Sequence, residues 1–140
     1  MSQTEALFDA IIVLARQRYH LAEKAFGTIG LNHSEARVLK RLSERGGEAT
    51  QDTLSADLVI DRSNTGRALK RLESAGLITR RKDEGDKRTN WVALTAQGED
   101  KLAAIAGVRQ DMIKQVFKDL SEDDAATIMT LLGPSLQANE

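Results

Sequence analysis

A short stretch past the middle of the chain constrains the fold most strongly. Residues 86–98 read Asp-Lys-Arg-Thr-Asn-Trp-Val-Ala-Leu-Thr-Ala-Gln-Gly, the pattern of a β-strand that leads into a helix. β-Prone runs at 77–82 and 88–94 surround the segment Asp-Glu-Gly-Asp, which is rich in turn-forming residues. The sequence therefore predicts one β-hairpin, or wing, in a chain whose other segments show helical periodicity.

Three short helices are predicted before the wing. They are expected to end at about residues 45, 59 and 75, and each begins after a residue that can cap a helix N-terminus, namely Ser34, Thr50 and Asp61. Three short helices of which the last two are separated by only a few residues are typical of the core of a helix-turn-helix.

Longer helices are predicted on both sides of this core. Residues 4–26 carry apolar side chains on more than one face, so we expect this helix to be buried on more than one side. Thr95 can cap a helix to about residue 120, and Ser121 can cap a last helix that Gly133-Pro134 should end or kink. The predicted fold class is mainly α, a single domain in which a winged helix-turn-helix at 34–94 is flanked by dimerisation helices at 4–26 and 95–138.

Composition narrows the classes of function. The chain of 140 residues has no cysteine and two histidines, so neither a disulfide framework nor a dedicated metal site or cofactor is expected. The longest uninterrupted apolar run, Ala10 to Ala15, is far short of the ~20 residues that span a bilayer. We therefore expect a cytoplasmic protein without a membrane partner.

Charge is concentrated in one segment. Residues 62–88 hold nine basic and four acidic side chains, whereas the segments before and after carry net charges of -2 and -4. A basic centre between acidic arms can contact phosphates locally while the arms repel nucleic acid. A solvated surface helix and hairpin would give the same charge pattern, so the cluster alone leaves both interpretations open.

The helix predicted at 61–75 divides into two faces. Thr65, Ala68, Leu69 and Leu72 share the inward face, and the outward face consists of Ser63, Arg67, Lys70 and Ser74, flanked by Asn64 and Arg71. Arginine pairs with guanine and asparagine with adenine in the major groove, so Asn64 and Arg67 are the predicted base readers. Ser63, Lys70 and Arg71 are predicted to hold phosphate. An ordinary amphipathic surface helix is the alternative.

The predicted wing adds further basic side chains near its tip, namely Arg80, Arg81, Lys82, Lys87 and Arg88. Beside a recognition helix such residues can clamp the neighbouring DNA backbone and groove. Trp91, the only tryptophan, is expected to pack a seam between the wing and the flanking helices.

Residues 34–98 resemble the DNA-binding lobe of the multiple antibiotic resistance regulator (MarR) family. Two blocks carry the resemblance: Asp-Arg-Ser-Asn at 61–64 through Gly-Leu-Ile at 76–78, and Asp-x-Arg at 86–88 followed by Leu-Thr-x-x-Gly at 94–98. The resemblance implies that Arg88 enters the minor groove, that Asp86 orients it by an ion pair, and that Arg67 is the recognition-helix arginine. Gly66 departs from the family pattern and is compatible with relaxed stability or with closer approach of the backbone to DNA.

The resemblance also implies partners. Relatives form twofold dimers, which read two half-sites about one helical turn, ~10 bp, apart on double-stranded DNA. Relatives commonly bind small aromatic or phenolic anions in a crevice between the dimerisation helices and the DNA-binding lobe. On the first helix the candidate crevice residues are Arg16, Tyr19 and His20, each of which can equally be a structural or surface residue.

Three classes of function fit the sequence to different degrees. A ligand-responsive, homodimeric DNA-binding repressor accounts for the charge distribution, the helix faces, the wing and the flanking helices together. An enzyme is not expected, because the sequence has no Gly-rich phosphate loop, nucleophile elbow or metal-ligand cluster. A winged helix that contacts only proteins is the alternative, and it would lack the steep salt dependence of DNA binding.

Overall fold

The computed structural model describes residues 1–137 and confirms the predicted fold class, a mainly helical chain with a winged helix-turn-helix. Its elements in chain order are α1 (Gln3–Gly27), α2 (His33–Glu44), β1 (Glu48–Thr50), α3 (Gln51–Leu58), α4 (Arg62–Ser74), β2 (Ile78–Lys82), β3 (Asn90–Leu94), α5 (Ala96–Phe117) and α6 (Glu122–Gln137). No helix within residues 1–137 is both long enough and apolar enough to cross a membrane.

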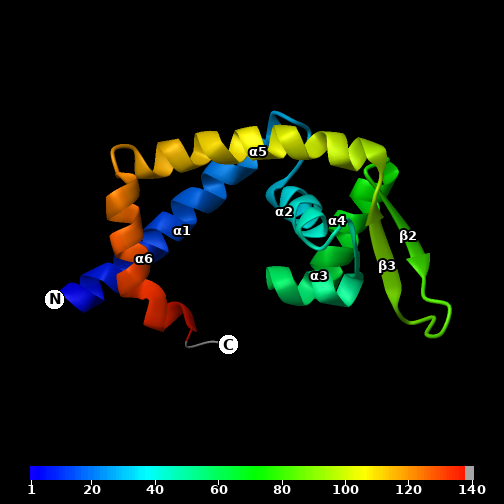
Figure 1. The fold of residues 1–140 in the computed structure, drawn as a ribbon, viewed down its shortest axis with the longest axis horizontal. Coiled ribbons are helices and arrows are strands. Elements are labelled where there is room, and N and C mark those ends of the chain that lie inside the picture. Colours follow the sequence, from blue (N-terminus) through cyan, green and yellow to red (C-terminus); the bar gives the residue numbers. More distant parts are fainter. Residues whose placement is uncertain (138–140) are drawn as a thin grey trace.

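Two parts of the molecule are visible in Figure 1. Helices α2, α3 and α4 lie with the wing at one end of α5, and α6 descends from the other end of the same helix. Helix α1 runs obliquely away from α5, so the N-terminus lies far from the wing. The long α5 thus joins the winged lobe, formed by α2–α4 and the sheet, to an arm that contains α1 and α6.

A small antiparallel sheet forms the wing and ties it to the lobe. The strand order is β1-β3-β2, with Ala49 opposite Val92 and Arg81 opposite Trp91. The sequence predicted β2 and β3 but not β1, because three residues are too few to show the alternation that identifies a strand. Pairing with β1 makes β3 the central strand, which fixes the wing against the helices.

The hydrophobic core lies mainly in the winged lobe. Its largest fully buried apolar side chains come from all three short helices and from the sheet: Val38, Leu39, Leu42, Leu54, Leu69, Leu72, Ile78 and Val92. Ala22 and Phe26 of α1 and Ile105 and Met112 of α5 join the same cluster. Helix α1 therefore joins the core near its C-terminal end, whereas α5 joins it from its middle and its second half.

Helix starts follow the predicted capping chemistry with one exception. Thr50, Asp61 and Thr95 each accept a hydrogen bond from the backbone N–H three residues later, and Ser121 accepts one from Asp124. The prediction of Ser34 as the cap of α2 was wrong. Asn32 caps that helix, because its side chain and that of Glu35 bond each other's backbone N–H at 2.8 and 2.7 Å.

Two expectations about the long helices can be compared with the structure of the single chain. Helix α1 is not buried on more than one side within this chain, since only Ala22 and Phe26 are buried and Phe8 is 68% exposed. Pro134 does not end α6, which continues to Gln137, but the last turns of the helix change direction in Figure 1, in agreement with the expected kink. Residue 138, the last of the predicted C-terminal dimerisation segment, lies outside the described residues.

Candidate nucleic-acid interface

Helix α4 is held rigidly at its N-terminus. The hydroxyl of buried Thr65 donates to the backbone carbonyl of Asp61 at 3.0 Å and accepts from the hydroxyl of Ser55 on α3 at 2.9 Å. Since Thr65 contributes both its backbone N–H and its side chain to Asp61, the first turn of α4 is fixed relative to α3. The backbone positions that carry the outward side chains of this turn are therefore fixed.

The two predicted faces of α4 are present. Thr65, Ala68, Leu69 and Leu72 are buried, and every polar residue predicted for the outward side is exposed, namely Ser63, Asn64, Arg67, Lys70, Arg71 and Ser74. Within this outward set, Arg67 donates to the side-chain oxygen of Asn64. Arg71 lies at the edge of the face, where its Nε is 3.5 Å from the carboxylate of buried Glu35.

The wing tip is built around Asp83. Its carboxylate accepts the backbone N–H groups of Gly85 and Asp86, both at 2.9 Å, and the indole N–H of Trp91 at 2.8 Å. The indole bond, followed by the two backbone bonds, lowers the pKa of Asp83. Trp91 therefore stabilises the tip of the wing through its bond to Asp83. The Arg81 guanidinium lies 5.4 Å from the centroid of the Trp91 ring.

The predicted basic residues of the wing fall into two groups. Lys82, Lys87 and Arg88 are exposed, and Arg88, with a side chain 94% exposed, lies 3.4 Å from the Asp86 carboxylate. The ion pair implied by the family resemblance is thus present. In contrast, Arg80 pairs with Glu73 of α4 at 3.0 Å, and Arg81 pairs with Glu48 of β1 at 2.8 Å. These two arginines tie the wing to the lobe.

One ion-pair cluster joins α3 to α2 and to the residue that follows it. Asp57 accepts from Arg41 at 2.8 Å and from both the Nε and Nη2 of Arg45 at 2.9 and 2.8 Å. The bonds from Arg45 and then Arg41 lower the pKa of Asp57. Arg37 adds a bond to the backbone carbonyl of Leu58 at the end of α3. Sequence reasoning did not find these residues, because their partners lie on another helix.

Comparisons with known proteins agree with this geometry. The model of the MarR family matches residues 31–89, which include the helix-turn-helix and the first half of the wing. An uncharacterised HTH-type transcriptional regulator of Bacillus subtilis, YkoM, is 30% identical over 103 residues, which are 74% of this chain and 66% of that protein. The chain belongs to the MarR family.

Solved structures extend the match over nearly the whole chain. A mutant of Escherichia coli MarR complexed with operator DNA is 25% identical, with a TM-score of 0.79 and coverage of 94% of each chain. Bordetella bronchiseptica BpsR, whose DNA binding is regulated by 6-hydroxynicotinic acid, shares the fold at 17% identity, with a TM-score of 0.83 and coverage of 94% of this chain and 99% of that chain. This MarR-family protein is a DNA-binding transcriptional regulator.

The residues predicted to bind an effector lie on the surface of this MarR-family protein. Arg16, Tyr19 and His20 are exposed on α1. A cavity of about 400 Å³ between α1 and α5 is lined by apolar side chains with Arg18 and Arg109 at its edge. No local pattern marked Arg109 as a site residue, because α5 meets α1 only in the tertiary structure.

A smaller cavity of about 40 Å³ lies where α1, α2 and α5 meet, and it includes Arg18, His33, Arg37 and Arg109. His33 stacks on the Phe26 ring with centroids 6.1 Å apart. Burial, followed by the nearby Arg18 and Arg37, lowers the pKa of His33. This junction between the long helices and the lobe therefore brings three guanidinium groups close to the imidazole of His33.

Proposed function

We propose that this protein is a ligand-responsive repressor that binds a pseudo-palindromic operator as a homodimer, with α4 in the major groove and the wing at the minor groove. The observation that carries the proposal is the joint placement of an exposed polar face on α4 and an exposed basic wing tip on one rigid lobe. The Arg80–Glu73 pair, at 3.0 Å, holds the wing directly against α4.

The predicted contacts differ in kind. On α4, Arg67 reads base edges, while Ser63 and Lys70 hold phosphate. On the wing, Lys82, Lys87 and Arg88 are exposed and contact the neighbouring backbone and minor groove. Arg80 and Arg81 support this contact indirectly, because their guanidinium groups pair with Glu73 and Glu48 and so hold the wing to the lobe. No enzymatic step is part of the proposal.

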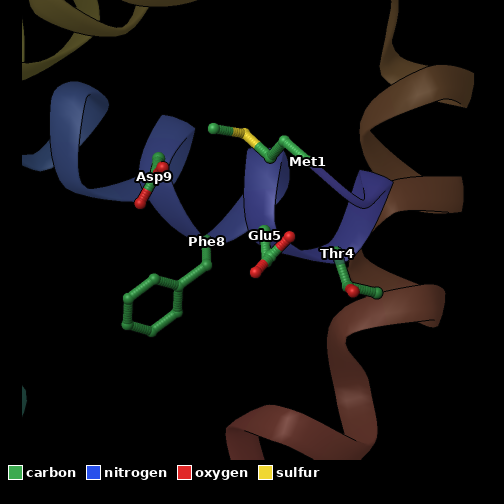
Figure 2. Close-up of a pocket in the computed structure, with 5 residues that line it drawn as sticks. All are labelled: Met1, Thr4, Glu5, Phe8 and Asp9. Atoms are coloured by element: carbon green, nitrogen blue, oxygen red, sulfur yellow. The ribbon is translucent and has the colours of Figure 1, made fainter.

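Unpartnered apolar surface supports the homodimer. Helix α6 buries none of its described residues, although it carries Ile128, Met129 and Leu131. The first turns of α1 expose Leu7, Phe8 and Ile11, and Figure 2, a view of the hollow of about 680 Å³ beside them, shows the Phe8 ring projecting away from its own helix. Apolar surface of this extent is typical of an interface. A second copy packed on α1 and α6 would cover it and bring two winged lobes to one operator.

The proposed effector is a small aromatic or phenolic anion in the cavity between α1 and α5. A volume of about 400 Å³ with an apolar lining suits a single aromatic ring. Arg18 or Arg109 can pair with a carboxylate or phenolate. Binding there would change how α1 and α5 meet the lobe, and with it the separation of the two recognition helices.

Salt dependence tests DNA binding directly. We expect affinity for selected duplexes to fall log-linearly as salt rises, and Arg88→Ala to weaken binding broadly and flatten that slope by about one. Lys114→Ala, which removes a charge from the exposed surface of α5, is the matched control and should leave the slope unchanged. A flat salt response of the unaltered protein would favour the protein-binding alternative.

Two further measurements test the assembly and the effector. Sedimentation at micromolar concentration should show a dimer, and a monomer would contradict the model of two half-sites. Calorimetric titration with simple aromatic acids should show binding that Arg109→Ala weakens. Equal binding by the variant would place the anion elsewhere.

A further inference from the structure

Three polar side chains along the exposed start of α4 form a continuous hydrogen-bonded chain. Asp61 caps the helix with one carboxylate oxygen, which accepts the backbone N–H of Asn64 at 2.7 Å. The other carboxylate oxygen accepts the side-chain amide nitrogen of Asn64, also at 2.7 Å. The amide oxygen of Asn64 in turn accepts a hydrogen bond from Arg67 Nη2.

The chemistry of the two outer residues fixes the orientation of the central amide. An ionised carboxylate only accepts hydrogen bonds, and a guanidinium only donates them. The Asn64 amide must therefore turn its NH2 group toward Asp61 and its oxygen toward Arg67. The reversed amide would place oxygen against oxygen on one side and donor against donor on the other.

Asp61, the first residue of this hydrogen-bonded chain, is itself held in place by a buried residue. The backbone carbonyl of Asp61 accepts both the N–H and the hydroxyl of Thr65, at 2.9 and 3.0 Å. Thr65 is 1% exposed and is held in turn by Ser55 of α3. Because Asp61 is fixed to the core, its bonds fix the position of the Asn64 side chain, and Asn64 in turn fixes the position of the Arg67 guanidinium.

This arrangement changes the role expected for Asn64. Pairing with adenine requires both the NH2 group and the oxygen of an asparagine amide, and here each is engaged by a charged neighbour. Arg67 has five N–H donors and uses one of them on Asn64, which leaves enough for a two-pronged contact with guanine.

We propose that Asn64 is a positioning residue for Arg67 and not a reader of its own base. The inference rests on the proposed function, because it assumes that Arg67 faces the operator. Holding the arginine in place before binding lowers the side-chain entropy lost in the complex. Asn64 thereby sharpens the preference at the base pair that Arg67 contacts.

A double-mutant cycle on a selected operator tests the proposal. Arg67→Ala should weaken binding about 10- to 100-fold and Asn64→Ala about 3- to 10-fold. The double variant should bind within about twofold of Arg67→Ala alone, because Asn64 acts only through the arginine. Lys114→Ala, on the exposed surface of α5 and outside the proposed DNA-contacting face, is the control and should bind like the unaltered protein.

Selection of bound sequences from random duplexes provides a second readout that loss of stability alone would not change. Asn64→Ala should relax base preference at the same base pair as Arg67→Ala. Relaxation at a different base pair, or losses that multiply in the double variant, would overturn the positioning role while leaving DNA binding intact. An unaltered protein that selects no duplex would instead overturn the proposed function itself.

Discussion

Replacement of Gly98 even by alanine should destabilise the folded protein, although alanine normally favours a helix over glycine. It occupies the first turn of α5, where the helix passes directly over the segment that joins α4 to β2. A Cβ added at this position would lie 2.2 Å from the backbone carbonyl oxygen of Leu77 and 3.0 Å from Cδ2 of Leu94. The glycine that ends the Leu-Thr-x-x-Gly motif is therefore required by close packing.

The energetic cost of Gly98→Ala depends on how far the backbone of Leu77 must move. The carbonyl of Leu77 has to retreat by at least 0.8 Å to reach the 3.0 Å that real Cβ contacts tolerate. It is not free to do so, because it accepts the backbone N–H of Thr95 at 3.2 Å and Leu77 is only 9% exposed. Overpacking usually costs about 1–3 kcal/mol, and a backbone obstacle places Gly98→Ala near the upper end, at about 3 kcal/mol.

Thermal unfolding followed by circular dichroism measures this cost. At fixed protein concentration, about 3 kcal/mol corresponds to a fall in Tm of roughly 6–12 °C for a chain of this size. Gly107→Ala in the same helix is the matched control, because no atom lies within 4 Å of its added Cβ. The control should gain about 1 kcal/mol from higher helix propensity. A Gly98→Ala protein as stable as Gly107→Ala would refute the reasoning.

Three further predictions concern the winged lobe. Because Arg45 and Arg41 lower the pKa of Asp57, its carboxylate stabilises the fold above the unfolded pKa of about 4 and loses that contribution as the pH falls through the lower folded value. Urea unfolding should therefore show a larger loss of stability from neutral pH to about pH 3 for the unaltered protein than for Asp57→Asn, and equal losses would contradict the cluster. Asp83→Ala should alter the fluorescence of Trp91, the only tryptophan, by removing the partner of its indole N–H, and an unchanged spectrum would argue against that bond. Gly66→Ala should stabilise the protein by about 1 kcal/mol, since its added Cβ meets Gln51 at an ordinary 3.6 Å; unchanged DNA affinity would indicate relaxed stability, and weakened affinity a need for close backbone approach.

Local signals explain why much of the fold could be predicted. Thr50, Asp61 and Thr95 cap helices through bonds that reach only three residues along the chain, so the sequence contains the whole interaction. The faces of α4 follow from helical periodicity in the same way. The capping error at Ser34 arose because Asn32, two residues earlier, offers an equally good cap and has Glu35 at the spacing of a capping box.

The roles of individual site residues required the tertiary structure. The sequence grouped Arg80 and Arg81 with Lys87 and Arg88, since all are basic and near the wing tip. Only the fold shows that the first two face Glu73 and Glu48. The cavity proposed for the effector depends on the fold in the same way: Arg18 and Arg109 are far apart in the chain, and both line this cavity only because α1 packs along α5.

The sequence by itself determined the elements of this protein: its caps, the two faces of its recognition helix, and a wing whose Asp86 and Arg88 are close neighbours in the chain. Each depends on interactions within a few residues, where periodicity and spacing are sufficient. Only the tertiary structure decided which basic side chains pair with acidic residues of other elements, as Arg80 and Arg81 do, because those pairings join segments distant in sequence. It also showed how much of α1 and α6 is left uncovered, since the apolar surface that one chain cannot bury is known only after the chain has folded.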